Sequence, residues 1–253
     1  MLKTAVEAAR RAGRLIVERY PVGHTVTVKG YRDITTEVDA AAERVILDLI
    51  RDRFPGHAIL SEEAGGDGIG DGYTWVVDPL DGTTNYTCRL PIFSVSIGLL
   101  EGGEPLIGVV HDPLCDQTFV AERGGGARLD GAPIRASRVA RLEHAMVSLD
   151  WGHSDAERGQ TLWWLTQVAP RCGTVRALGS AALALAYVAA GWLEAYFNLM
   201  MKPWDAAAGM LLVSEAGGRC TTLEGGAYRV DRPGCVATNG LIHDQLLGVM
   251  RKT

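Results

Sequence analysis

The stretch at residues 75–86, which reads WVVDPLDGTTNY, constrains the fold and the chemistry of this chain more than any other. An apolar strand leads directly into Asp78 and Asp81, and no lysine or arginine within the stretch neutralises them. Two carboxylates held near each other raise the free energy of ionising both, so a site that keeps both charged holds a cation or raises one pKa. Hard oxygen ligands of this kind favour magnesium, manganese or calcium over zinc. The stretch therefore predicts a strand that ends in a metal site.

The residues that follow the two aspartates indicate an anion site at the same turn. Residues 82–85 combine a flexible glycine with two hydroxyls and free backbone amides, which is typical of a helix that begins beside a bound phosphate. A purely structural alternative stays open, because Asp-Gly is a common turn signal and aspartates cap helices in proteins that bind nothing. Taken alone, the motif leaves capping and catalysis equally open.

Two further segments favour catalysis. The apolar run at 58–60 ends in Ser61, Glu62 and Glu63, so a second strand delivers carboxylates at its carboxyl end, where open α/β sheets bind their ligands. Farther along the chain, Asp205 follows a proline and a tryptophan and stands in the first turn of an alanine-rich helical run. The helix dipole by itself is an alternative explanation for that aspartate.

Hydrophobic periodicity predicts different element patterns in the two halves of the chain. In the first half, helices are expected at 2–20 and 37–54, and strands at 25–28, 58–61, 74–78, 93–100, 105–111 and 117–122. In the second half, strands at 146–149 and 193–197 alternate with helices at 155–169, 180–190 and 204–216. The side chains of the second helix expected to face inward are Ala41, Val45, Ile46, Leu49 and Ile50.

This order predicts two lobes. Residues 1–140 would form an N-terminal α+β lobe that carries the main metal motif. Residues 141–253 would form a C-terminal α/β lobe that carries the Trp-Asp pair and the substrate-side residues. The active site is expected between the two lobes.

Composition and charge exclude several classes of protein. A net charge of −5 argues against a nucleic-acid partner, although bound cations would still allow an anionic substrate. No apolar run is long enough to span a bilayer, and charges stand where a secretory signal needs an apolar core, so no membrane contact and a cytoplasmic location are expected. The five cysteines lack any CxxC spacing, which argues against zinc and a disulfide framework.

These motifs together resemble the inositol monophosphatase family of magnesium-dependent, lithium-sensitive phosphatases. Five segments carry the resemblance and occur in the family's order: residues 29–39, 62–63, 75–86, 176–182 and 204–218. Because they are spread over nearly the whole chain, the resemblance is far more specific than a lone glycine-rich motif. It implies a layered α-β-α-β-α sandwich of the sugar-phosphatase type that commonly forms homodimers.

The resemblance also implies which residues would hold the metal and perform the catalysis. Two or three magnesium ions would be bound by Glu62, Asp78, Asp81, Asp205 and the backbone carbonyl of Leu80. Glu62, Asp81 and Thr83 would be the catalytic residues, with the Thr83 hydroxyl orienting the attacking water. A simple helix cap is the alternative role for Thr83. No protein nucleophile is required when a metal activates the water.

The substrate side and an N-terminal loop follow from the same resemblance. The substrate-binding residues would be Gly82, Thr83, Gly179, Ser180, Ala181, Asn198 and Asp205. Lys29, Asp33 and Asp39 would belong to a mobile loop that closes over the site, with a solvated turn as the alternative. Asn198 departs from the family, which usually carries a glutamate there that accepts hydrogen bonds from substrate hydroxyls. We therefore expect weaker selectivity for inositol phosphate, unless Asn198 merely ends a strand.

The predicted function is magnesium-dependent hydrolysis of inositol monophosphate, or of a similar small polyol or sugar phosphate. The alternatives on the same scaffold are fructose-1,6-bisphosphatase, histidinol-phosphatase, nucleotide 3'-phosphatase and NADP phosphatase. A non-catalytic regulatory protein with the same fold is a further alternative, and the presence of every expected metal ligand argues against it.

Overall fold

The computed structural model describes residues 1–66 and 68–251. Its helices are α1 (Leu2–Arg19), α2 (Glu37–Arg53), α3 (Thr83–Thr87), α4 (Asp155–Val168), α5 (Ala181–Ala189), α6 (Pro203–Glu215) and α7 (His243–Met250), with a short 3-10 helix η1 (Leu142–His144). The strands of the first half are β1 (Val26–Gly30), β2 (Asp33–Thr36), β3 (Ala58–Ser61), β4 (Gly65–Gly66), β5 (Tyr73–Asp81), β6 (Ser94–Glu101), β7 (Glu104–Asp112), β8 (Gln117–Glu122), β9 (Gly126–Leu129) and β10 (Ala132–Pro133). Those of the second half are β11 (Met146–Leu149), β12 (Thr174–Arg176), β13 (Ala195–Asn198), β14 (Arg219–Thr221) and β15 (Cys235–Thr238).

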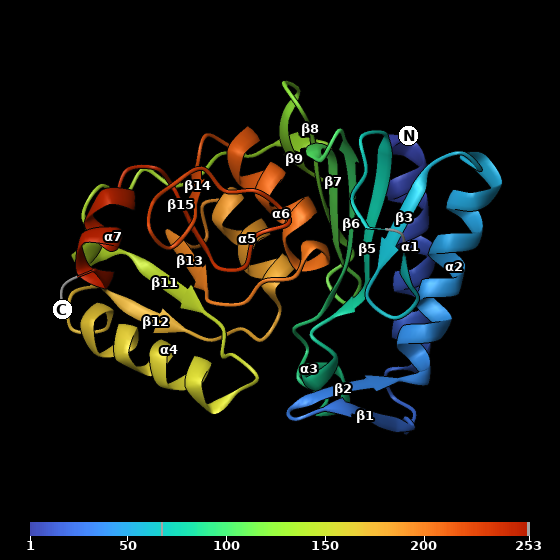
Figure 1. Cartoon of the computed structure of the whole chain (residues 1–253), viewed down its shortest axis with the longest axis horizontal. Coiled ribbons are helices and arrows are strands. Elements are labelled where there is room, and N and C mark those ends of the chain that lie inside the picture. The colour runs from blue at the N-terminus through green and yellow to red at the C-terminus, as the bar shows by residue number, and fades with distance from the viewer. Residues whose placement is uncertain (67, 252–253) are drawn as a thin grey trace.

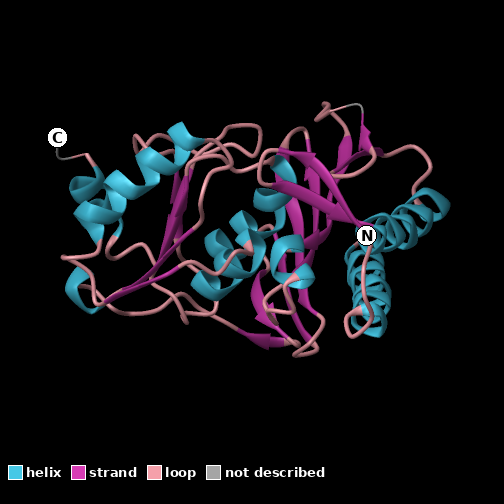
Figure 2. Ribbon diagram, turned by 90° about the horizontal axis from the view of Figure 1, so that it is seen from below, coloured by secondary structure: helices cyan, strands magenta, loops and turns pink. Residues whose placement is uncertain are grey.

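The elements stack in five layers, which Figure 1 shows from one side to the other. Helices α1 and α2 cover one face of an eight-stranded sheet of order β10-β9-β8-β7-β6-β5-β3-β4. Helices α5 and α6 lie between this sheet and a five-stranded sheet of order β12-β11-β13-β15-β14. Helices α4 and α7 cover the outer face of the smaller sheet, and Figure 2 shows the same alternation from below. The expected α-β-α-β-α sandwich is confirmed.

The two sheets come from different parts of the chain. Every strand of the larger sheet precedes residue 140, and every strand of the smaller sheet follows it. The two halves nevertheless share one apolar core, because α5 and α6 pack against Val110 and Phe119 of the larger sheet and Tyr196 of the smaller one. The division into lobes at residue 140 stays a prediction.

Helix α6 lies unusually close to the larger sheet. A Cβ atom added to Gly108 in β7 would come within 2.5 Å of the backbone oxygen of Ala208. Such a contact is impossible without movement of the backbone, so a glycine is required there. This close approach sets the distance between α6 and the sheet. It thereby sets the position of Asp205 in the first turn of α6.

The inner face of α2 differs from the predicted one. Ile46 and Ile50 are buried as expected, whereas Ala41, Val45 and Leu49 are only partly buried. Val38, Ala42 and Leu47 complete the buried apolar part of the helix. The polar residues Asp39 and Glu43 are also buried, and both bond to groups near the candidate site.

Several short elements were not predicted. These are β2, β4, β9, β10, β12, β14, β15, α7 and η1. Most have two to four residues, too few to show periodicity. In the described part of the chain, no helix is both long and apolar enough to cross a membrane.

Candidate active site

A cavity of about 290 Å³ brings most of the predicted site residues together. The predicted residues that line it are Asp33, Glu62, Asp78, Leu80, Asp81, Gly82, Thr83, Gly179, Ala181, Asn198 and Asp205. They come from the β1–β2 hairpin, the ends of β3, β5 and β13, and the starts of α3, α5 and α6. A larger cavity of about 530 Å³ beside α1 contains none of the predicted site residues.

Strand β5 contributes Asp78, Leu80 and Asp81 to the lining of this cavity. The strand pairs with β6 up to Asp78, slips in register, and pairs again at Asp81, so both aspartates lie at its end. Gly82 follows with a φ of 93°, a left-handed conformation that suits glycine. Helix α3 then begins at Thr83, as the motif predicts, but it is only five residues long. Binding of a phosphate by the amides of this turn stays a prediction.

Asp81 accepts four hydrogen bonds, three from the start of α5 and one from β6. Its Oδ1 accepts from the backbone N–H of Ala181 at 3.0 Å, and its Oδ2 accepts from the N–H of Ala182 at 3.1 Å. The hydroxyls of Ser94 and Ser180 also donate to Oδ2. Burial raises the pKa of Asp81, and these hydrogen bonds counteract part of the increase. Through these bonds, the metal motif at the end of β5 contacts the predicted substrate-side segment at the start of α5.

Asp78 and Asp205 face the same cavity from opposite elements. Asp78 Oδ1 accepts from the Leu80 N–H at 3.0 Å, and Asp205 Oδ2 accepts from the Lys202 N–H at 2.8 Å. Removal from water raises the pKa of both carboxyls well above the usual range. Repulsion by Glu62 and by Asp81 raises each pKa further. Within residues 1–66 and 68–251, neither aspartate forms an ion pair with a lysine or arginine.

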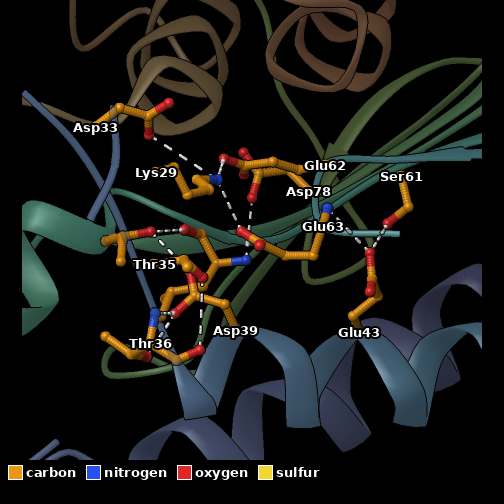
Figure 3. A network of polar contacts seen from close by, with 12 residues as sticks. Lys29, Asp33, Thr35, Thr36, Asp39, Glu43, Ser61, Glu62, Glu63 and Asp78 are labelled. Carbon is orange, nitrogen blue, oxygen red and sulfur yellow. Dashed lines mark hydrogen bonds and ion pairs between the residues drawn. The ribbon is translucent and has the colours of Figure 1, made fainter. Parts of the chain in front are cut away.

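Lys29 supplies positive charge at the rim. Its Nζ lies 2.8 Å from Glu62 Oε1, 3.0 Å from Glu63 Oε1 and 3.9 Å from Asp33 Oδ1, as Figure 3 shows. Burial by itself lowers the pKa of Lys29, but the hydrogen bonds and charges of Glu62 and Glu63 raise it above its ordinary value. Lys29 therefore stays protonated and bridges the N-terminal hairpin to the end of β3.

Thr83 and Asp39 form a direct pair. Thr83 Oγ1 lies 2.8 Å from Asp39 Oδ1 and 3.0 Å from the carbonyl oxygen of Leu80. Asp39 does not lie in a loop: it stands in the first turn of α2, where it closes a capping box with Thr36. The segment before it, which contains Lys29 and Asp33, is the β1–β2 hairpin rather than an irregular loop. That this hairpin moves stays a prediction.

Glu43 is a supporting residue that the sequence analysis missed. Its Oε1 accepts from the Ser61 hydroxyl and from the N–H groups of Glu63 and Ala64, at 3.2 Å and 3.0 Å for the two amides. Figure 3 shows it reaching from α2 to the turn that carries Glu62. A signal was present, because Asp39 and Glu43 are four residues apart on an otherwise apolar helix face.

A second missed group lies on the opposite wall. Asp150 lines the cavity directly after β11 and accepts a hydrogen bond of 2.7 Å from the Tyr196 hydroxyl. Removal from water raises the pKa of Asp150 to about 7, against the opposing effect of its hydrogen bonds. Asn198 also lines the cavity, but its amide bonds to the Tyr196 hydroxyl and the Met200 N–H. No sequence motif marks Asp150.

The donor set fits a hard divalent cation. In the part of the chain that the structure describes, no three His, Cys, Asp or Glu side chains already converge on one point as a ligand shell. The carboxylates instead bond to Lys29, to hydroxyls and to backbone amides. Their chemistry nevertheless suits magnesium, because ionised oxygens that repel one another in a cavity gain most from a small cation. Leu80 lines the same cavity, and its carbonyl oxygen lies 3.0 Å from the Thr83 hydroxyl.

Comparison with known proteins gives the same picture over the whole chain. The fold is that of the layered α+β proteins of the sugar-phosphatase type. The solved structure of suhB from Bartonella henselae matches with a TM-score of 0.94 at 36% identity, over 99% of this chain and 98% of that chain. The IMPase of Thermotoga maritima matches with a TM-score of 0.92 at 38% identity, over 98% and 96%.

Sequence comparison defines the family. The model of the inositol monophosphatase family matches residues 1–252, and the chain belongs to this family. It is 41% identical to the Nus factor SuhB of Escherichia coli, over 99% of this chain and 96% of the relative. It is 36% identical to the inositol-1-monophosphatase of Mesorhizobium japonicum, over 100% of this chain and 96% of the relative.

Proposed function

We propose that this protein is a magnesium-dependent phosphate monoester hydrolase that acts on inositol monophosphate or a similar small polyol or sugar phosphate. One observation carries the proposal: Glu62, Asp78, Asp81 and Asp205, from three separate parts of the chain, line a single cavity. Membership of the inositol monophosphatase family supports the same activity.

In this proposal Glu62, Asp78, Asp81, Asp205 and the Leu80 carbonyl hold two or three magnesium ions. Bound magnesium would lower the pKa of a water molecule and neutralise phosphate oxygens. Asp39 accepts a hydrogen bond from the Thr83 hydroxyl, so the oxygen of Thr83 can still accept a hydrogen bond from the attacking water. Thr83 thereby orients the water for in-line attack on phosphorus.

The remaining residues bind and shield the substrate. The amides of Gly82 and Thr83 would bind the phosphate, and the segment of Gly179, Ser180 and Ala181 would lie against the alcohol half. Lys29 balances the charge of Glu62 at the rim and would leave it when a cation arrives. The β1–β2 hairpin would move with Lys29 and cover the cavity.

A phosphate-release assay tests this function. The panel contains myo-inositol 1-phosphate, glycerol 2-phosphate, fructose 1,6-bisphosphate, histidinol phosphate, adenosine 3'-phosphate and NADP. We expect hydrolysis of the polyol phosphates with magnesium, inhibition by lithium, and unproductive competition by calcium, whose larger radius and irregular coordination misplace the water. Equal turnover with calcium and magnesium would count against the proposed metal site.

The same assay distinguishes a phosphatase from a regulatory protein of the same fold. A relative is named Nus factor, so a protein of this fold with a role other than ester hydrolysis is a specific alternative. Absence of phosphate release from every ester at saturating magnesium would favour it. The net charge of −5 supports a small ester rather than a nucleic acid as the ligand. A homodimer belongs to the proposal and rests on the family resemblance. A cytoplasmic location also belongs to it, as the expectation from charge and hydropathy.

A further inference from the structure

Asp150 lies beside Asn198, where two interior strands of the smaller sheet, β11 and β13, end. Strands β11 and β13 run parallel, with Leu149 opposite Phe197, so the residues that follow these two positions are neighbours at the carboxyl ends of both strands. Both line the cavity that contains Asp81 and Asp205. Asp150 belongs to neither of the elements, β5 and α6, that carry those two carboxylates.

The Asp150 carboxylate is held in one orientation from two sides. Its Oδ1 accepts from the Gly179 N–H at 3.0 Å, and its Oδ2 accepts from the Tyr196 hydroxyl at 2.7 Å. The Tyr196 hydroxyl in turn accepts from Asn198 Nδ2 at 3.0 Å, and Asn198 Oδ1 accepts from the Met200 N–H at 2.9 Å. Since Tyr196 is fully buried, its hydroxyl orients the Asp150 carboxylate from the protein interior, while Asp150 itself lines the cavity.

Asp150 can accept more hydrogen bonds from a ligand than Asn198 can, and it accepts them with a charged group. Each carboxylate oxygen can accept about two hydrogen bonds, so one further bond remains open on each oxygen of Asp150. The Asn198 side chain has one acceptor atom, which is neutral and already accepts from the Met200 N–H, so only one further bond remains open on it. In the described part of the chain, Asp150 forms no ion pair with a lysine or arginine.

The Asp150 carboxylate lies next to the position proposed for the phosphate ester. The Gly179 N–H binds Asp150, and two residues later the Ala181 N–H binds Asp81. Two residues of chain span at most about 7 Å, so the two carboxylates are held at adjacent points of one wall. An anionic acceptor at this distance favours a neutral group that carries hydroxyls and disfavours a second phosphate.

We infer that Asp150 accepts hydrogen bonds from the hydroxyl groups of the alcohol half of the substrate, and that Tyr196 and Asn198 act as its positioning residues. The selectivity for polyol phosphates then comes from Asp150, and position 198 acts only through Tyr196. This inference rests on the proposed phosphatase activity and names the substrate class of the same site.

The test compares two esters in the Asp150→Asn variant. One ester, myo-inositol 1-phosphate, has hydroxyls next to the phosphate, and the other, 4-nitrophenyl phosphate, has none. Asparagine can still accept the Gly179 bond, so the fold should persist, as a thermal melt will check. We expect kcat/KM for the inositol ester to fall about tenfold, mainly through KM, because a charge-assisted hydrogen bond becomes neutral. The value for the aryl ester should stay unchanged.

Two further variants complete the design. Tyr196→Phe keeps the carboxylate but removes the hydroxyl that orients it, and should raise KM for the inositol ester with little change in kcat. Asp244→Asn, at an aspartate whose side chain is 85% exposed on α7, is the matched control and should change neither ester.

Two results with Asp150→Asn would overturn the inference: an equal loss for both esters, or no loss for either. A wild-type protein that releases phosphate from no ester of the panel with magnesium would refute the proposed function itself, together with this inference. One that hydrolyses other panel esters but not myo-inositol 1-phosphate would overturn this inference alone.

Discussion

Asp78, Asp81 and Asp205 are placed where each makes the ionisation of the others more costly. Removal from water and mutual repulsion raise the pKa of Asp78 and Asp205 well above the usual range. Carboxylates in such an arrangement do not stabilise the metal-free fold. Their presence together is therefore a functional feature. It destabilises the metal-free fold, and interactions elsewhere in the protein must offset that free energy.

This cost leads to a prediction for Asp205→Asn. Asparagine can still accept the hydrogen bond from the Lys202 N–H, so the start of α6 should remain intact. One anionic ligand is lost, and we expect activity to fall more than about a hundredfold. The melting temperature of the metal-free protein should hold or rise, because repulsion within the cavity decreases. Near-normal turnover at saturating magnesium would show that Asp205 is not a ligand; Asp244→Asn is again the control.

At the residue level, the sequence predicted those side chains that belong to a dense motif. The run from Asp78 to Thr83 and the Glu62 and Asp205 segments indicated their positions because several chemical signals coincide within a few residues. Asp150 was missed because a single aspartate after a short strand carries no local signal. Only the parallel pairing of β11 with β13, which is a long-range contact, brings it into the cavity.

Among the elements, α6 has the most demanding position. It carries Asp205 at its start and rests on the larger sheet, where Gly108 leaves no room for a Cβ atom. The distance between helix and sheet is thus set by a missing side chain. A change there must move α6, and with it one wall of the cavity.

We therefore predict that Gly108→Ala destabilises the protein by about 1–3 kcal/mol through overpacking. It should also weaken magnesium activation, since Asp205 moves with the helix. Gly248→Ala is the matched control, because nothing lies within 4 Å of a Cβ atom at that position in α7. Alanine is the better helix former, so this control should be neutral or slightly stabilising. Urea unfolding and a magnesium titration measure both effects; an unchanged Gly108→Ala protein would disprove the close-packing argument.

The longest elements were the most predictable. Helices α1 and α2 and strands β7 and β8 were predicted to within two residues at each end, because their apolar positions repeat over several turns or pairs. The four-residue strands β3 and β11 were also predicted, each from a short apolar run. The strands β14 and β15 were missed although β15 is fully buried. Three or four residues between glycine-rich turns do not distinguish a strand from a loop. Tertiary pairing with β13 determines their conformation.

At the scale of the whole molecule, the cavity links stability to pH and to metal. Asp150 has its pKa raised to about 7 from 3.8, and Asp78 and Asp205 are raised well above 3.8. The folded protein therefore binds more protons than the unfolded chain once pH exceeds the unfolded pKa, and its stability falls as pH rises through the folded pKa. His243 acts in the opposite direction below pH 6.5, because burial lowers its pKa from 6.5 to about 4.

Between pH 6.5 and pH 8 the carboxylates dominate, since most of the His243 contribution lies below pH 6.5. We predict that the melting temperature of the metal-free protein falls across this range, and that Asp150→Asn makes the fall smaller. Magnesium binds only the ionised carboxylates of the folded protein, so it should raise the melting temperature more at pH 8 than at pH 6.5. At a concentration of about 100 times its dissociation constant, magnesium adds about 2.7 kcal/mol of stability. Differential scanning calorimetry with EDTA or magnesium measures both. A melting temperature that rises with pH in EDTA, or an equal magnesium effect at both pH values, would show that the cavity carboxylates are already ionised without metal.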